Sequence, residues 1–161
     1  MLNMKALKKR ICRCLCPKKP LREVVLIFPY NTETDELFII QEYIHHYKKS
    51  FWKFVSGGVD KAGKDLFTHA QEELAEEVSM ESDNLYHFYS FEKIFGNRGI
   101  HCYIAENPKL MKKPIDNPDL DIIEKGTWIT EAMFQEMVND HKLIWNEWAM
   151  VAQQVFNRHK K

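Results

Sequence analysis

Long apolar runs are absent from the sequence, and none approaches the roughly 20 residues that a membrane-spanning helix needs. The N-terminus has the positive charges of a signal peptide, but nothing like the apolar stretch of about 7–15 residues follows them. We therefore expect a cytoplasmic protein. With 161 residues, 45% of them hydrophobic and 12% aromatic, the chain is expected to form one globular domain with a core of its own.

Acidic residues are missing from residues 1–22, which hold eight basic ones: Lys5, Lys8, Lys9, Arg10, Arg13, Lys18, Lys19 and Arg22. The rest of the chain has 15 basic and 23 acidic side chains, a net charge of −8. We therefore divide the chain into a basic, cysteine-containing arm at residues 1–21, expected to be flexible, and an acidic domain at residues 22–161.

Cysteine pairs at metal-ligand spacing are also missing. Cys12, Cys14 and Cys16 alternate inside the basic arm, and Cys102 lies far away in an apolar run. This alternation differs from the C-x-x-C pair of a structural zinc site or a redox motif. Exposed, reduced thiols are the simplest interpretation, and lipid attachment beside a basic patch is a second one.

The apolar pattern predicts strands mixed with helices. We expect strands at residues 24–28 (ending at Pro29), 37–40, 52–55, 86–92, 100–105 and 126–129, the first two forming a hairpin. Helices are expected at residues 65–78, 131–139 and 144–156, with Asp65 and Thr130 as N-caps of the first two. This order predicts an α/β or α+β sandwich.

The helix expected at residues 65–78 carries an acidic arc beside an apolar stripe. The stripe consists of Phe67, Ala70, Leu74 and Val78. Glu73, Glu76 and Glu77 fall on the arc, where like charges at spacings of one, three and four repel one another. A divalent cation would reverse that cost, and carboxylate oxygens are the ligands that Mg²⁺ prefers. A solvated acidic helix face is the alternative.

A glycine pair precedes this helix. Gly57 and Gly58 follow the strand expected at residues 52–55, and Gly58 stands 15 residues before Glu73. Glycine lets the backbone approach a phosphate closely. A strand, a glycine turn and a carboxylate-bearing helix together suit a metal-bound diphosphate.

These residues resemble the Nudix signature, G-x5-E-x7-R-E-U-x-E-E-x-G-U, in which U is aliphatic. The positions that match are Gly58, Glu73, Leu74, Glu76, Glu77 and Met80. The resemblance implies an α/β/α sandwich with a mixed sheet, and a hydrolase that binds Mg²⁺ or Mn²⁺ through Glu73, Glu76 and Glu77. Because glycine allows close backbone approach, we select Gly57 and Gly58 as candidate substrate contacts.

Three positions depart from the signature. Lys64 and Glu72 stand where the family has a glutamate and an arginine that pair and brace the loop against the helix. Because both have changed sign, we expect Lys64 and Glu72 to contact each other. Ser79 replaces the glycine that usually ends the helix at positive φ, so we expect the helix exit to differ in shape.

The resemblance is to the ADP-ribose pyrophosphatase type, because an acidic segment precedes the last expected strand. That segment contains Asp116, Asp119, Asp121 and Glu124, and we select Glu124 as a candidate catalytic base. Arg98 is a candidate phosphate contact. The expected reaction is hydrolysis of a nucleoside diphosphate linked to another group, such as ADP-ribose or a nucleotide sugar.

Two other functions stay open on the sequence. The basic arm would suit a 5′ RNA end or cap as substrate, although nucleic acid is the less favoured partner. The altered positions Lys64, Glu72 and Ser79 would suit a catalytically silent binding module. A homodimer is also open, since many ADP-ribose-type relatives are dimers.

Overall fold

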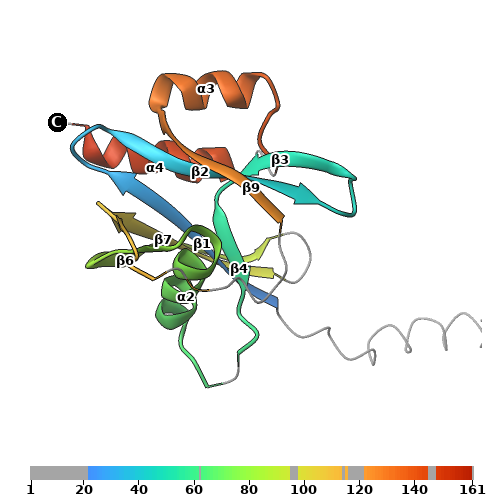
Figure 1. Cartoon of the computed structure of the whole chain (residues 1–161), viewed down its shortest axis with the longest axis vertical. Coiled ribbons are helices and arrows are strands. Elements are labelled where there is room, and N and C mark those ends of the chain that lie inside the picture. Colours follow the sequence, from blue (N-terminus) through green and yellow to red (C-terminus); the bar gives the residue numbers. More distant parts are fainter. Residues whose placement is uncertain are drawn as a thin grey trace, which may run out of the picture.

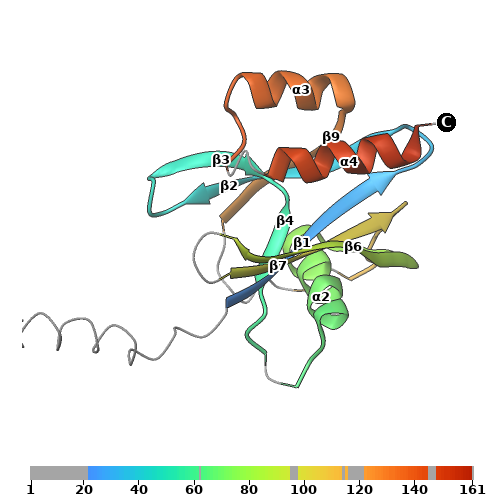
Figure 2. The same cartoon turned by 180° about the vertical axis from the view of Figure 1, so that it is seen from behind.

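The computed structural model describes residues 22–61, 63–94, 98–113, 115, 122–144 and 148–160. A mixed β-sheet lies at its centre, with helix α2 on one face and helices α3 and α4 on the other (Figure 1). The view from behind shows the same three layers (Figure 2). The α/β/α sandwich expected from the sequence is therefore confirmed.

The main sheet has the strand order β3-β2-β1-β7-β6, with β4 paired to β1 and β9 paired to β2. Its strands are β1 (Arg22–Asn31), β2 (Glu36–Ile44), β3 (Lys49–Lys53), β4 (Val55–Gly58), β6 (Asn84–Ile94), β7 (Arg98–Glu106) and β9 (Ile122–Thr130). The short strands β5 (Met80–Glu81) and β8 (Lys109–Leu110) form a second sheet. The helices are α2 (Leu66–Val78), α3 (Glu131–Asn139) and α4 (Ala149–His159).

Strand β1 is the hub of the sheet, and its alternate side chains enter two different cores. Val25 and Ile27 pack with Leu74 of α2, whereas Leu26 and Phe28 pack in a cluster that includes residues of α3 and α4. Alternation along a strand sends successive side chains to opposite faces. The apolar run at residues 24–28 is therefore continuous because both faces of β1 are covered.

Strand β1 continues beyond Pro29, where the sequence pattern predicted its end. One edge of β1 pairs with β4 as far as Ile27, and pairing with β2 on that edge resumes at Tyr30. Pro29 thus lies between the segment of β1 that pairs with β4 and the segment that pairs with β2. No antiparallel pairing is recorded at this residue, so the sheet tolerates a proline, which has no N–H to donate. On the other edge β1 runs parallel to β7.

The expected strand at residues 52–55 is two strands. Lys53 ends β3, which pairs with β2, and Val55 begins β4, which pairs with β1. The chain changes sheet partner at the buried Phe54. The alternation of polar and apolar residues at 52–55 could not reveal this break, because it does not show which strand each residue pairs with.

The helix bounds match the sequence in two cases and differ in the third. Helices α2 and α3 span the expected residues, with Asp65 and Thr130 as their N-caps. Helix α4 begins at Ala149 and not near residue 144, because Ile144 N–H donates to the carbonyl of Trp52 at 2.9 Å. No helix in the described part of the chain is long and apolar enough to cross a membrane.

Candidate functional site

Helix α2 presents glutamates to the interior as well as to solvent. Its first turn is capped by Asp65, whose Oδ1 accepts from Thr68 N–H at 2.7 Å. Ala70 and Leu74 are buried as expected, but Phe67, placed in the same stripe by the sequence, is exposed. The buried face of α2 is therefore rotated relative to the predicted apolar stripe. It includes Glu73 and Glu77 and leaves out Phe67.

Glu73 lies directly against the glycine pair, which the structure places in strand β4 and not in the turn expected from the sequence. A Cβ built on Gly57 would stand 1.9 Å from Cδ of Glu73 and 2.0 Å from its Oε1. The Glu73 side chain is only 6% exposed. Gly57 is therefore required here for close approach, since the carboxylate of Glu73 occupies the space that any other side chain would need.

Glu77 belongs to a buried group of three charges. Lys53 Nζ donates to Glu77 Oε1 at 3.0 Å and to Glu42 Oε2 at 2.6 Å, and Ser56 N–H donates to Glu77 Oε2 at 2.9 Å. Burial alone would lower the pKa of Lys53, but the attraction of Glu77 and Glu42 outweighs it and raises that pKa. Lys53 is therefore a buried ammonium ion, and sequence reasoning missed it.

Glu76 and Glu72 are held by two further lysines. Lys61 Nζ donates to Glu76 Oε1 at 3.0 Å and to Glu72 Oε2 at 3.1 Å. Lys64 Nζ donates to the other oxygen of Glu72, so the contact expected between Lys64 and Glu72 is present. The hydrogen bond from Lys64 lowers the pKa of Glu72. The glycine-to-helix loop is therefore tied to α2 by lysines on the loop and glutamates on the helix.

Helix α2 ends in the conformation that the usual glycine would adopt. Ser79 has φ 54° and ψ 38°, in the left-handed region, and its N–H donates to the Ala75 carbonyl at 3.0 Å. The expectation that the exit would differ in shape is therefore wrong. Ser79 adopts this left-handed conformation without being glycine, and its carbonyl accepts from Met111 N–H at 2.8 Å.

The other predicted contacts lie at two places on the sheet. Gly58 pairs with Val24 of β1 and Arg98 pairs with Arg22, so both stand at the same end of β1, and both are exposed. Glu124 is exposed on β9. It is the extra residue of a β-bulge opposite β2, between the partners of Gln41 and Glu42, and bulges of this kind redirect a side chain.

Some residues singled out in the sequence fall outside the described part of the chain: Cys12, Cys14, Cys16, Asp116, Asp119 and Asp121. Trp52 of β3 is half-buried, with Lys125 Nζ 5.2 Å from the centre of its ring. Phe54 is a core residue that packs on Phe28. Packing within the domain therefore accounts for both aromatics.

Among the described residues, no three His, Cys, Asp or Glu side chains converge as a metal-holding group. The reason is local, because the oxygens of Glu76 and Glu77 point at the ammonium groups of Lys61 and Lys53. The donor set nevertheless fits Mg²⁺ or Mn²⁺, since Glu73 and Glu76 stand one turn apart on one face of α2 and offer carboxylate oxygens.

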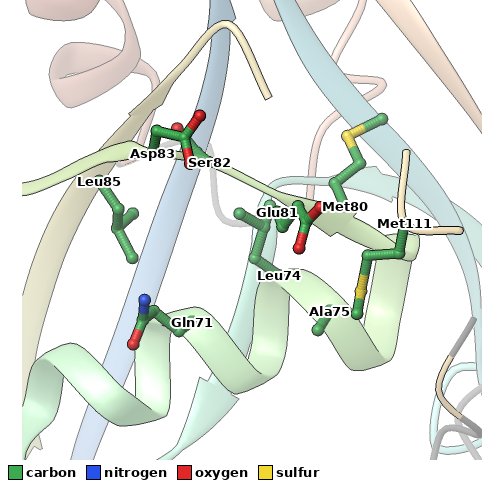
Figure 3. Close-up of a pocket in the computed structure, with 9 residues that line it drawn as sticks. All are labelled: Gln71, Leu74, Ala75, Met80, Glu81, Ser82, Asp83, Leu85 and Met111. Carbon is green, nitrogen blue, oxygen red and sulfur yellow. The ribbon is translucent and has the colours of Figure 1, made fainter. Parts of the chain in front are cut away.

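A pocket of about 220 Å³ lies elsewhere, on the far side of α2 (Figure 3). It is bounded by Gln71 and Ala75 of α2, by residues 80–83 and by Met111. At about 100° per residue, Gln71 and Ala75 face away from Glu73 and Glu76. The pocket therefore does not belong to the carboxylate site.

Comparison with solved structures identifies the fold of this chain. No protein-family model matches the sequence, and no curated protein matches it. A solved structure described as an ADP compounds hydrolase has a TM-score of 0.66 and 22% identity, over 87% of this chain and 73% of that one. A structure from work on MutT of the fish pathogen Aliivibrio salmonicida and of Vibrio cholerae has a TM-score of 0.63 and 20% identity, over 85% of this chain and 98% of that one. The chain has the Nudix fold.

Proposed function

We propose that this protein is a divalent-metal-dependent hydrolase of nucleoside diphosphates linked to a second group, with ADP-ribose or a nucleotide sugar as the leading substrate. The observation that carries the proposal is the carboxylate of Glu73, held against Gly57 of β4 by a helix that also bears Glu76 and Glu77. An acidic surface helix would not need a carboxylate packed against a strand glycine. The fold shared with an ADP compounds hydrolase and with MutT supports the same reaction class.

In this proposal Glu73, Glu76 and Glu77 supply the carboxylates of the metal site. A bound Mg²⁺ or Mn²⁺ would neutralise charge on the phosphate oxygens and lower the pKa of a water molecule. Gly57 and Gly58, at the end of β4, bring backbone close to the diphosphate, and Arg98, at the same end of β1, contacts its charge.

The reaction consumes one water molecule. Its oxygen bonds to one phosphorus, the bridging P–O bond breaks, and the two products leave as phosphate monoesters. Glu124, at the bulge beside Glu42, is the candidate acceptor of the water proton. Glu124 lies on β9, a different element from the metal-binding helix α2.

The test is release of AMP from ADP-ribose in the presence of Mg²⁺ or Mn²⁺, alongside a panel of nucleotide sugars and other nucleoside diphosphate derivatives. Glu76→Gln should abolish the activity, while Glu81→Gln, in the pocket on the far side of α2, should retain it. Equal rates for the two variants would rule out α2 as the metal-binding helix.

A catalytically silent binding module is the second candidate. The observation that favours it is that Lys61 and Lys53 already donate to Glu76 and Glu77. Such a module would bind a nucleoside diphosphate derivative without cleaving it. Calorimetric binding of ADP-ribose, combined with no product from any member of the panel in Mg²⁺ or Mn²⁺, would decide for the module.

A further inference from the structure

The hairpin of β2 and β3 ends in aromatic rings and basic side chains. Residues 43–51, which we call the hairpin tip, contain no aspartate or glutamate, although residues 22–161 carry a net charge of −8. Tyr47 is 55% exposed. The hairpin extends to one side of the molecule (Figure 1). The rings and lysines of the tip are Tyr43, His45, His46, Tyr47, Lys48, Lys49 and Phe51.

The rings of the hairpin tip lie against one another. The centre of the Tyr47 ring is 5.0 Å from that of His46 and 5.6 Å from that of Phe51, and both contacts are edge-to-face. Lys49 Nζ stands 5.2 Å from the centre of the Phe51 ring. Because more than half of Tyr47 is nevertheless exposed, its ring keeps surface for a stacking partner from outside the domain.

Strand alternation places part of the hairpin tip on the face of the sheet that carries the candidate site. Lys53 of β3 donates to Glu77 of α2, so its side chain points to the α2 side. Every second side chain of a strand points the same way, so Phe51 and Lys49 lie on that side too. Tyr47 contacts Phe51 there. One face of the hairpin therefore carries rings and ammonium groups from Lys53 outward to the tip.

The two lysines of the hairpin tip differ from the lysines around the candidate site. Lys53, Lys61 and Lys64 all donate to glutamates. Lys48 and Lys49 form no ion pair with any carboxylate in the part of the chain that the structure describes. Both are exposed. Their charges therefore face solvent and suit an anion from outside the domain.

We propose that the hairpin tip binds single-stranded nucleic acid, with a base stacked on Tyr47 and phosphates beside Lys48 and Lys49. Every base has a face that stacks on an aromatic ring, and lysines attract the phosphate backbone, so rings and cations together suit a single strand of any sequence. A duplex suits the tip less, because its bases already stack on one another. This inference goes beyond the proposed hydrolysis and does not depend on it.

Two other anionic partners would use the same lysines. A membrane surface is bound by apolar side chains that enter below the headgroups, whereas the exposed side chains here are histidine, tyrosine and lysine. An acidic peptide would pair with Lys48 and Lys49 and would have no base to stack on Tyr47. The contribution of the Tyr47 ring therefore separates nucleic acid from both.

The experiment measures the fluorescence anisotropy of a labelled ten-nucleotide uridine RNA during titration with the full-length chain, in EDTA so that no metal-dependent hydrolysis occurs. The wild type should bind this RNA at least about fivefold more tightly than an abasic chain of the same length and charge. Tyr47→Ala should lose at least about fivefold in affinity, and Tyr47→Phe should keep it. Tyr89→Ala, which removes a tyrosine 53% exposed on β6, is the matched control and should bind as the wild type does.

The dependence of affinity on salt tests the lysines. Lys48→Gln with Lys49→Gln should reduce the slope of log affinity against log salt by about 1.4, because each phosphate contact on a single strand contributes about 0.7. Lys112→Gln with Lys113→Gln removes another exposed lysine pair and should leave the slope unchanged. The basic arm at residues 1–21 is the same in both variants, so its own attraction for RNA cancels in this comparison.

Several results would overturn the inference. A wild type that does not bind the RNA, or that binds the abasic chain equally well, would refute stacking at the hairpin tip. Tyr47→Ala binding as tightly as Tyr89→Ala would assign the affinity to charge elsewhere, including the arm. Loss of binding to phosphatidylserine vesicles in Tyr47→Ala, with no RNA binding by the wild type, would assign the tip to a membrane. Circular dichroism checks folding, and the lysine variants test the tip should Tyr47→Ala not fold.

Discussion

The Glu73 carboxylate occupies the place where a side chain on Gly57 would have to stand, with its oxygens within 2.3 Å of that position. This contact joins the end of strand β4 to the middle of α2. It also explains the glycine by steric exclusion, because Gly63 is the only glycine in the described part of the chain with positive φ. Gly57 and Glu73 thus form one unit, in which a change to either moves the other.

Gly57→Ala should reduce hydrolysis at least about tenfold and lower stability by about 1–3 kcal/mol, because the added methyl displaces Glu73 from β4. Steady-state kinetics and urea unfolding would measure the two effects. Gly58→Ala is the control for stability, since its Cβ meets no atom within 4 Å. A Gly57→Ala protein as stable as Gly58→Ala would show that Glu73 does not rest where the structure has it.

Lys64→Glu should lower stability by roughly 1 kcal/mol or less, since it sets a carboxylate beside Glu72 in a half-exposed place. Adding Glu72→Arg should recover only part of that loss. The new arginine would pair with the carboxylate introduced at position 64 but would also face Lys61, which donates to Glu72 in the wild type. Urea unfolding of the single and double variants at low and high salt would measure this. Full recovery in the double variant would mean that Lys61 contributes nothing to the brace.

Ser79→Gly should stabilise the protein by about 1 kcal/mol, because serine at φ 54° bears a steric cost that glycine does not. Ser79→Ala is the matched control and should give no gain, since alanine has the same cost at positive φ. Both are measured by chemical denaturation. Equal stabilities for the glycine and alanine variants would place the helix exit in a different conformation.

The C-terminal end of α4 should show a pH-dependent attachment to β7. Glu106 accepts hydrogen bonds from Tyr86 and His159. Burial opposes ionisation of Glu106, but these hydrogen bonds outweigh it and hold its pKa below the ordinary value.

A carboxyl whose pKa is depressed on folding contributes stability above its unfolded value, and the contribution is lost as pH falls through the folded value. The stability difference between the wild type and Glu106→Gln should therefore be present near neutrality and shrink below about pH 4.5. Denaturant unfolding across that range measures it. A difference that grows on acidification would contradict the assignment.

Local signals in the sequence were sufficient for α2 and α3. Asp65 and Thr130 stand as caps at the residues where their side-chain oxygens meet amide groups, and such capping depends only on neighbours in the chain. The pairing of Lys64 with Glu72 was also predictable, since both had changed sign against one signature.

Lys53 and Lys61 were not predictable in the same way. Lys53 lies 24 residues before Glu77 and Lys61 lies 15 residues before Glu76, and only the fold decides whether such pairs meet. The polar position of Lys53 between Trp52 and Phe54 was the available signal, but alternation cannot say what a buried side chain will face. The prediction that Phe67 is buried failed for a related reason. The buried face of α2 contains Glu73 and Glu77, and Phe67 lies outside it.

The pairing of β1 has a consequence for the order in which the chain assembles. Residues 22–78 contain β1, its antiparallel partners β2 and β4, and helix α2, so the glycine pair and its glutamates can come together early in synthesis. The other edge of β1 waits for β7, whose residues 98–106 are made much later. Until then this strongly apolar strand presents an unpaired edge, which is the kind of surface that binds chaperones or recruits another nascent chain.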